Sequence, residues 1–544
     1  MDKMETKDKS ERESDSQTET HGSGIKIHRK HRKKQEDAKV DARDILTDEE
    51  MGLKEEKSIS PSLEVVMRAL EEKVGLHRSF DIVFREMEFG TKRVAFFYVN
   101  GFAKDTVLTD VITRLTYVDE EELQPDPLKS FLERFVPHIQ VESMHELDKV
   151  IEFVLMGSCG MFIEGETSAL VVDAKSFPVR SIEEPDLEKV VRGSRDGFVE
   201  TLLTNVTLVR RRIRDPRLKL ELLTVGKRTN THVCIGYIED IANPDLVKAI
   251  QDKIKTVAID GIPLGDKQLE EAIMGKGWNP YPSVRYSERP DVVSSHMLEG
   301  HIILFVDTSP SVMILPCTFF HLVQHVEEYR QTPIVGSYLR WVRFVGIFGS
   351  LFLLPLWFLL VQSPEMKPAG LEFLGPQKQG ELPLLLQFLL VEVGVDMMRL
   401  AAVHTPSPLT VAMGLVAAIL VGDIAVKTGL FINEVIMYMA VAAIGMFCTP
   451  SYELGLANRL VRLALLVLVA IFDGTGFVLG STLWVVVLAV QRSYNAPYLW
   501  PFIPFDAKAM LNIMFRLPVL SSKIRLSITN ARDKTRQPPG KEQG

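Results

Sequence analysis

Hydrophobic residues follow two different patterns along this 544-residue chain. Up to about residue 340, short apolar runs alternate with charged segments, whereas residues 344–491 are dominated by Leu, Val, Ala, Phe, Met and Gly. Short runs with a period of two or of 3.6 residues predict strands and helices of α/β units. Long apolar stretches predict membrane helices. We therefore expect a soluble α/β region of two small mixed-sheet units, followed by an all-α membrane bundle of several spans.

The same pattern sets the expected domain boundaries. Residues 1–60 are polar, charged and nearly free of aromatic residues, which predicts a disordered tail. Residues 61–190 and 191–335 each alternate strand and helix patterns, so each is a predicted α/β unit without an evident internal repeat. Residues 336–495 are assigned to the membrane domain. Residues 496–544 are assigned to a cytoplasmic C-terminal tail.

Five apolar stretches lie in the predicted membrane domain. Phe344–Val361 is an uncharged run of 18 residues, which as a helix reaches about 27 Å and matches the hydrocarbon core of a bilayer. The other four follow in order: Pro383–Val403, Leu409–Val426, Val435–Thr449 and Leu463–Gln491. The last stretch is long for one span and short for two, which favours a hairpin at its Gly-rich segment 474–480.

Charge bias predicts the orientation of these spans. Lys and Arg gather before the first span, after the last span, and in a predicted loop at 450–462 that contains Arg459 and Arg462. Cytoplasmic loops are enriched in these residues. The first 60 residues hold no apolar segment, so no signal peptide is expected. Both termini should therefore be cytoplasmic, which requires an even number of crossings.

Three ionisable residues lie inside the second apolar stretch: Glu392, Asp396 and Arg399. Their spacing places them within about 60° of one helical face. Unpaired charge at mid-bilayer costs at least about 2.5 kcal/mol per group, so this face must meet protein or water. It either forms a salt-bridge cluster, in which Asp396 and Arg399 neutralise each other, or lines an ion path. Three more residues are candidates for the same cavity: Asp423, Lys427 and Glu434.

Composition and missing motifs exclude several classes of protein. A net charge of −8 argues against nucleic-acid binding. The four cysteines (Cys159, Cys234, Cys317 and Cys448) are far apart and are expected to be buried and unpaired. There is no P-loop, GxGxxG, HExxH or GxSxG motif, so we expect neither an enzyme nor a bound cofactor. The basic run at 26–34 either holds the tail against anionic lipid or is a solvated arm.

His321 and His325 are four positions apart on a predicted helix, a spacing that can hold a metal. The glutamate that would follow the first histidine in a metalloprotease motif is missing. A pair of packing or surface histidines is far commoner. We therefore expect no metal site.

Several strings resemble the GerA family of spore germination membrane proteins. They include residues 193–200 (GSRDGFVE), Thr204-Asn205, the arginine run at 210–212, residues 288–291 (ERPD), and the turn at 306–310. The resemblance covers about residues 62–500. Ten signature residues are expected to be structural: Ser194, Arg195, Asp196, Gly197, Glu200, Asn205, Glu288, Arg289, Pro290 and Asp291. Asp196 or Ser194 is the expected N-cap of a helix over Phe198–Ile213.

The resemblance implies a protein of the inner membrane of bacterial spores that acts in germination. Its implied role is an oligomeric, ion-conducting or gating subunit linked to release of ions and dipicolinic acid. The implied partners are membrane lipid, further copies of the chain and smaller membrane proteins. A non-conducting scaffold and a germinant-receptor A subunit remain alternatives. A membrane-anchored enzyme is disfavoured by the missing motifs.

Overall fold

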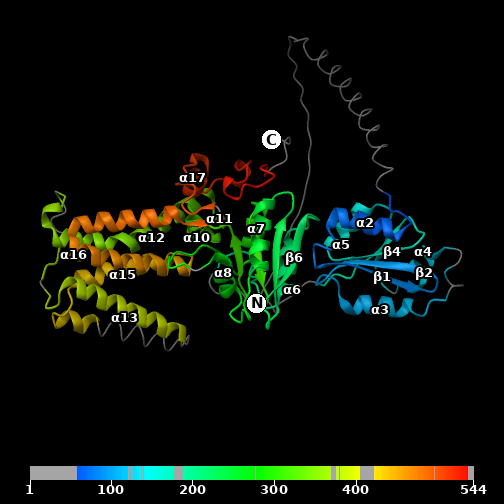
Figure 1. Cartoon of the computed structure of the whole chain (residues 1–544), viewed down its shortest axis with the longest axis horizontal. Helices are drawn as coiled ribbons and strands as arrows, with labels where there is room; N and C mark the ends of the chain where they lie inside the picture. Colours follow the sequence, from blue (N-terminus) through cyan, green and yellow to red (C-terminus); the bar gives the residue numbers. More distant parts are fainter. Residues whose placement is uncertain are drawn as a thin grey trace, which may run out of the picture. The chain divides into compact units, whose positions relative to one another are not determined.

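The computed structural model (Figure 1) describes residues 58–536 apart from short internal gaps. The gaps are residues 120–122, 124–125, 137, 139, 177–184, 186–187, 276, 369, 371–374, 379, 405–421 and 495. The predicted disordered tail, except for its last three residues, and most of the predicted span Leu409–Val426 therefore lie outside the described residues. Residues from Ile59 onward belong to one structural unit.

The first α/β unit is built around a five-stranded sheet in the order β1-β2-β4-β5-β3. The predicted strands Phe80–Glu88 and Arg93–Val99 correspond to its first hairpin, β1 and β2. Its elements are α2 (Leu63–Val74), β1 (Ile82–Phe89), β2 (Lys92–Val99), α3 (Asp105–Leu115), α4 (Pro127–Ser130), the π-helical turn Phe131–Phe135, β3 (Val141–Met144), α5 (Leu147–Leu155), β4 (Cys159–Ile163) and β5 (Ala169–Val172).

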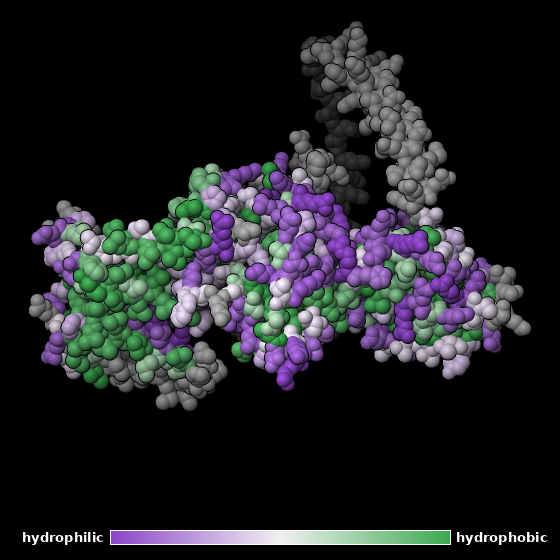
Figure 2. Space-filling model, viewed as in Figure 1, coloured by the Kyte–Doolittle hydropathy of each residue, from purple (hydrophilic) through white to green (hydrophobic). Residues whose placement is uncertain are grey.

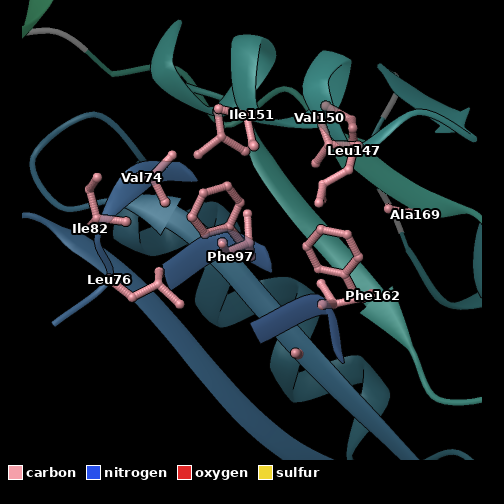
Figure 3. Close-up of a cluster of buried hydrophobic side chains, with 14 of the residues drawn as sticks. Val74, Leu76, Ile82, Phe97, Leu147, Val150, Ile151, Phe162 and Ala169 are labelled. Carbon is pink, nitrogen blue, oxygen red and sulfur yellow. The ribbon is translucent and has the colours of Figure 1, made fainter. Parts of the chain in front are cut away.

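Alternation along β2 explains how helices cover both faces of this sheet. Ala95 and Phe97 point to the face that α2 and α5 cover, where Phe97 packs with Phe162 and Ile151 (Figure 3). Val94 and Phe96 point to the opposite face, which α3 covers. Successive side chains of a strand point to opposite faces. A strand with apolar residues at both sets of positions is therefore buried on both sides.

The second α/β unit repeats the first. Its sheet has the order β6-β7-β9-β10-β8, the same strand order when counted from its own first strand. α6 and α9 cover one face, and α7 and α8 cover the other. Its elements are α6 (Leu202–Arg212), β6 (Leu218–Val225), β7 (Thr231–Ile238), α7 (Pro244–Lys255), α8 (Asp266–Met274), β8 (Arg285–Ser287), α9 (Pro290–Leu298), β9 (Ile302–Val306) and β10 (Val312–Leu315).

The expectation of mixed sheets is wrong for the described residues. Every strand pair of both five-stranded sheets is antiparallel. Hairpins such as β1–β2 and β6–β7 supply part of the pairing, and antiparallel strands need only a tight turn between them. The helical connections then return the chain to neighbouring strands in the opposite direction. Strand–helix alternation alone therefore did not distinguish a mixed sheet from an antiparallel one.

A buried ion pair joins the two α/β units. Arg210 of α6 donates to both carboxylate oxygens of Asp81, at 2.8 and 3.0 Å, and both side chains are fully buried. Beside them, the backbone N–H of Phe80 donates to the carbonyl of Leu220 on β6 at 3.1 Å. A bidentate arginine–carboxylate pair has a fixed geometry. It therefore sets how the first unit meets α6 and β6.

Helices dominate the rest of the chain. They are α10 (Phe319–Val323), α11 (Val326–Arg330), α12 (Pro333–Gln362), the 3₁₀ turn Pro364–Met366, α13 (Leu384–His404), α15 (Asn433–Phe447) and α16 (Tyr452–Val490). Among the described residues, α12 and α16 are long and apolar enough to cross a membrane, judged by length and composition, and α15 is a shorter apolar helix. Figure 2 shows that hydrophobic residues make up most of the visible face of this region.

The helix α16 folds back on itself at Asp473. This residue has φ 48° and ψ −133°, which is outside the helical range. A Cβ on Gly480 would lie 2.6 Å from the side chain of Leu465, although a straight helix would separate these residues by about 22 Å. α16 is therefore a helical hairpin that starts at Tyr452. The predicted stretch Leu463–Gln491 contains the end of its first arm and its whole second arm.

Residues after α16 differ from the expected C-terminal tail. They form β11 (Arg492–Ser493), β12 (Ala496–Pro497), α17 (Ala507–Met514) and two 3₁₀ turns, Val519–Ser521 and Ser527–Thr529. Arg340 of α12 donates to the carbonyls of Asn512 and Ile513, each at 2.8 Å. Further on, the N–H of Arg532 donates to the carbonyl of Ile241 in the second α/β unit. This segment therefore ties the helical region to that unit.

Candidate functional site

A buried glutamate lies at the centre of the helical region. Glu392 of α13 accepts two hydrogen-bonding contacts from Arg462 of α16, at 2.7 Å from Nε and 2.5 Å from Nη2. Arg459, one helical turn earlier, places its Nε 3.0 Å from the other carboxylate oxygen of Glu392 and donates to the Glu392 carbonyl at 2.5 Å. All three side chains are at most 3% exposed. We call this group the bundle clamp.

The bundle clamp draws together helices that are distant in sequence. Arg462 also donates to the carbonyl of Ser350 on α12 at 2.6 Å. One guanidinium therefore bridges α12, α13 and the first arm of α16. Removing one partner from a buried ion pair leaves an uncompensated charge and costs about 3–5 kcal/mol. The clamp is therefore a strong determinant of how these three helices pack.

Asp396 and Arg399 lie at the edge of the clamp and do not pair with each other. Asp396 contacts Arg459 instead, and its side chain is 45% exposed. Arg399 stacks over the rings of Phe447 and Tyr452, with 5.8 and 5.1 Å between guanidinium carbon and ring centre. A cation over an aromatic face is stabilised by the ring quadrupole. The expected neutralisation of Asp396 by Arg399 is therefore replaced by contacts across helices.

The charges of this site are incompletely satisfied. The clamp and its edge hold two carboxylates and three guanidinium groups, of which Arg399 contacts aromatic rings only, so one formal positive charge is left over. Glu392 Oε2, Arg459 Nε and Arg399 Nη1 are buried without a hydrogen-bond partner among the described residues. Charges that attract each other without aligned hydrogen bonds are held less firmly than a saturated network.

The three remaining candidates lie elsewhere. Asp423 and Lys427 pair with each other at 2.5 Å on an exposed helical turn. Glu434, at the start of α15, accepts a hydrogen bond from the N–H of Gln377 at 3.0 Å. Among the described residues, no contact joins these groups to the bundle clamp.

The arginines of the clamp correct one expectation. Arg459 and Arg462 were assigned to a loop and used as markers of the cytoplasmic side. In the structure they lie inside α16, which starts at Tyr452 with Ser451 as its N-cap. Their charges face Glu392 instead of solvent, so they carry no information on orientation.

A second glutamate is held in the same way where α11 meets α12. Glu328 accepts from Arg340 Nε at 2.7 Å and contacts Arg343 as well. Glu328 and Arg340 are buried, and Arg340 makes the two bonds to α17 described above. We call this group the joint clamp. In both clamps the two arginines are three positions apart on one helix, where side chains share a face.

The signature residues form a structural network between the start of α9, α6 and the segment before α6. Arg289 is fully buried and donates to Asp291 and to the carbonyl of Ser194. Asn205 of α6 accepts from the N–H of Val199 at 2.8 Å and donates back to its carbonyl. Among the other signature residues, the carbonyl of Glu200 accepts a hydrogen bond from the N–H of Thr308, and Pro290 begins α9. Gly197 is buried, whereas Arg195 is exposed.

The expected capping role of Asp196 and Ser194 is wrong. α6 begins at Leu202, whose backbone N–H donates to the carboxylate of Asp307, 105 residues later, at 3.3 Å. Asp196 instead pairs with Arg212 at the opposite end of α6, at 2.6 Å. Burial opposes ionisation, but the hydrogen bonds from Arg212 and Ser194 hold the pKa of Asp196 below its ordinary value.

A cluster of three histidines, of which His301 and His321 are buried and His296 is half-buried, was not predicted. The rings of His296, His301 and His321 are 5.1–5.8 Å apart between centres. Burial, reinforced by the nearby Arg285 cation, lowers the pKa of all three, that of His301 to about 4. His296 belongs to α9, His301 directly precedes β9, and His321 belongs to α10, so only the fold brings them together. His321 and His325 do not share a helix, because α10 ends at Val323.

No metal centre emerges from these groups. Among the described residues, no set of three or more His, Cys, Asp or Glu side chains is arranged to hold a metal ion. All four cysteines are free thiols, three of them buried. Burial raises the pKa of Cys159 and Cys317 to about 12, so both stay protonated and unreactive near neutral pH.

Comparisons with known proteins agree with the motifs. Residues 68–528 match the family described as Bacillus/Clostridium GerA spore germination protein. The chain is 46% identical over 466 residues to stage V sporulation protein AF of Bacillus subtilis, which covers 86% of this chain and 94% of that protein. It is 29% identical over 492 residues to spore germination protein KA of the same organism, covering 89% of each.

One solved structure is also similar. It is the crystal structure of the N-terminal domain of the A subunit of the Bacillus megaterium spore germinant receptor GerK3, which is 26% identical. The match covers 48% of this chain and 97% of that chain, with a TM-score of 0.39.

Proposed function

Because this chain belongs to the GerA family of spore germination proteins, we propose that it is a membrane subunit of a bacterial spore germination complex. In this proposal it resides in the inner membrane of the spore. It assembles with further copies of itself and with smaller membrane proteins. It conducts or gates ions when germination begins, and this flux is linked to the release of dipicolinic acid.

The bundle clamp is the observation that carries the proposal. Buried charges in an apolar helical region are costly and mark ion pathways or relays in membrane proteins. Glu392 is enclosed by Arg459 and Arg462, so we assign it to positioning the helices. Asp396 is the half-exposed carboxylate beside it, on the same helical face. We assign Asp396 to the wall of the ion path, which further subunits complete.

Contacts at the two ends of the helical region support an even number of crossings. The beginning of α12 contacts α17 through Arg340, and the end of α16 contacts the second α/β unit, where Gln491 donates to Tyr281 and Ser283. The far end of α12 lies at the turn of the α16 hairpin, where Gln362 Nε2 is 3.4 Å from the carbonyl of Ala470. We therefore assign both chain ends to one side, the cytoplasm.

A non-conducting scaffold is the second candidate. The complete enclosure of Glu392 favours it, since a clamp that only fixes packing has the same geometry. Conductance of the full chain in planar bilayers separates the two functions. An ion current that requires the protein supports the channel. A protein that assembles in the bilayer and passes no current, alone or with its membrane partners, supports the scaffold.

Cysteine labelling tests the membrane arrangement. Cysteines replacing Gln362 and Lys378, at the hairpin end, should react with an impermeant thiol reagent applied outside. A cysteine replacing Lys523 should not. The native thiols supply the background, because three are buried and Cys448 is half-buried. Outside labelling at Lys523 would contradict an even number of crossings.

A further inference from the structure

A large cavity lies where the second α/β unit meets the segment after α16. Its volume is about 820 Å³. One wall is a face of α7 that carries Leu246, Ala249 and Lys253 at helical spacing. The opposite wall comes from the β11–β12 hairpin and the loop after it, with Arg492, Tyr494 and Trp500. Nothing in the proposed function so far uses this cavity.

Two of the lining side chains are cations without a partner. Within the described part of the chain, neither the Lys253 ammonium group nor the Arg492 guanidinium group makes a hydrogen bond or an ion pair, and both residues are exposed. One lining carboxylate, Asp245, lies eight residues before Lys253 on α7, which is about 12 Å along the helix. The two cations therefore give the cavity a net positive charge that the protein does not neutralise.

Tyr494 adds a hydroxyl in need of a partner. Its Oη is buried and makes no hydrogen bond among the described residues. Burial raises the pKa of this phenol, so it remains a neutral donor. The residue has φ 45°, a conformation that a bulky side chain rarely adopts. A buried hydroxyl without a partner is costly unless a ligand or water completes it.

Large apolar side chains lie along the loop after β12, which forms one wall of this cavity. Trp500 and Pro504 line it, while Phe502, Ile503 and Phe505 on the same loop are 56%, 40% and 70% exposed. Arg492 follows the second arm of α16 by two residues. If α16 spans a membrane, as the proposed function states, this loop and the cavity lie at the membrane surface. Exposed aromatic residues and cations are typical of that depth.

We propose that this cavity binds the phosphodiester headgroup of an anionic phospholipid. Arg492 and Lys253 pair with the phosphate oxygens, and Tyr494 donates its hydroxyl to the same headgroup. The acyl chains lie against Phe502, Ile503 and Phe505. The inference rests on the membrane location in the proposed function. It makes the lipid a bridge between the second α/β unit and the end of α16.

Lipid binding by the full chain tests this site. Delipidated protein in detergent is mixed with dioleoyl phosphatidylglycerol, dioleoyl phosphatidylcholine or inorganic phosphate, and bound molecules are counted by native mass spectrometry. Phosphatidylglycerol should be retained and phosphatidylcholine should not. The double variant K253Q/R492Q should bind phosphatidylglycerol at least about tenfold more weakly, because charge-assisted bonds are lost. K255Q, on another face of α7, is the matched control and should bind normally.

Tyr494→Phe sharpens the test. It should weaken phosphatidylglycerol binding and yet raise the melting temperature of the lipid-free protein, since it removes a hydroxyl that has no partner. Wild-type binding by the double variant, or equal retention of phosphatidylcholine, would overturn the site. Displacement of the lipid by inorganic phosphate at equal concentration would overturn the lipid as its source. Conductance of the same preparations keeps this inference apart from the proposed function, because loss of lipid binding in the variants does not bear on whether the wild type passes a current.

Discussion

The joint clamp and the bundle clamp use the same chemistry in two regions of the molecule. Each holds one buried glutamate between two arginines on a single helix, Glu328 in the first case and Glu392 in the second. They differ in the sequence separation between the glutamate and its arginines. Glu328 lies 12 residues before Arg340, whereas Glu392 lies 67 residues before Arg459. The glutamate of the joint clamp is close in sequence to its arginines, whereas the bundle clamp joins three helices, α12, α13 and α16, that only the fold brings together.

The surroundings of the two clamps differ as well. Arg340 has two backbone acceptors in α17 besides Glu328, so its charge stays hydrogen-bonded if the glutamate changes. The bundle clamp has Asp396 at its edge, half-exposed and in contact with Arg459. The joint clamp has no such carboxylate among the described contacts. We conclude that the first region anchors, while the second anchors and also presents a charge.

Loss of the bundle carboxylate should have the largest effect. Glu392→Gln leaves buried Arg462 without a counter-charge and Arg459 with the half-exposed Asp396 alone, which should destabilise the helical region by about 3–5 kcal/mol. We expect a large fall in melting temperature in detergent and loss of assembly. Glu434→Gln, a change of the same kind on α15 at a group with one backbone bond, is the control. Normal assembly of Glu392→Gln would mean that the clamp does not hold the bundle.

As the pH falls, the region around the three-histidine cluster should lose stability before the helical bundle does. His296, His301 and His321 have pKa values lowered in the fold, that of His301 from 6.5 to about 4. Below pH 6.5 the unfolded chain binds protons that the folded chain excludes. Stability should therefore fall as the pH drops from about 6.5 to 4, by about 3 kcal/mol for His301 alone. The Arg285 cation faces the cluster and lowers the pKa of each histidine further.

Hydrogen exchange of the full chain at several pH values measures this difference. Peptides from α9, β9 and α10 should lose protection between pH 6.5 and 4, and His301→Asn should reduce that change. Equal loss of protection in the first α/β unit would point to a general acid effect and not to the histidines.

Loss of the joint carboxylate should cost less than loss of the bundle carboxylate. Glu328→Gln should destabilise the protein by about 2–3 kcal/mol, because Arg340 keeps its bonds to Asn512 and Ile513. Limited proteolysis should then cut residues 496–536 sooner than in the wild type. An effect equal to that of Glu392→Gln would remove the distinction between the two clamps.

The smallest effect is expected at Asp196. Its half-buried pair with Arg212 should be worth about 1 kcal/mol. Asp196→Asn distinguishes this pair from a helix cap, since Asn caps as well as Asp but cannot form the ion pair. We expect Asp196→Asn and Asp196→Ala to lower the melting temperature equally, and neither to do so in an Arg212→Met background. A loss confined to Asp196→Ala would restore the capping role.

The hydrophobic pattern predicted local elements well and long-range contacts poorly. The strands of the first hairpin and the family motifs could be identified from neighbouring residues, because alternation and turn residues are local properties. The antiparallel sheets and the repeated strand order could not, since they depend on pairing between segments with no common sequence pattern.

The bundle clamp shows the same limit. Glu392, Asp396 and Arg399 were visible as a charged face, but their partners lie on another helix. Arg459 and Arg462 looked like loop residues beside an apolar stretch. Ser451 was a usable signal, because a serine at this position caps the helix that carries them. With α16 started there, two arginines three positions apart would have been expected on one face.

The reversal potential of reconstituted protein in a salt gradient tests the central claim most directly. Asp396→Asn removes the half-exposed charge at nearly constant volume and leaves Glu392 with both arginines, so assembly should be normal. We predict that its current persists with a shifted reversal potential, and that the control Asp423→Asn gives the wild-type value. An unchanged reversal potential in Asp396→Asn, with assembly and current intact, would contradict the assignment of Asp396 to the ion path.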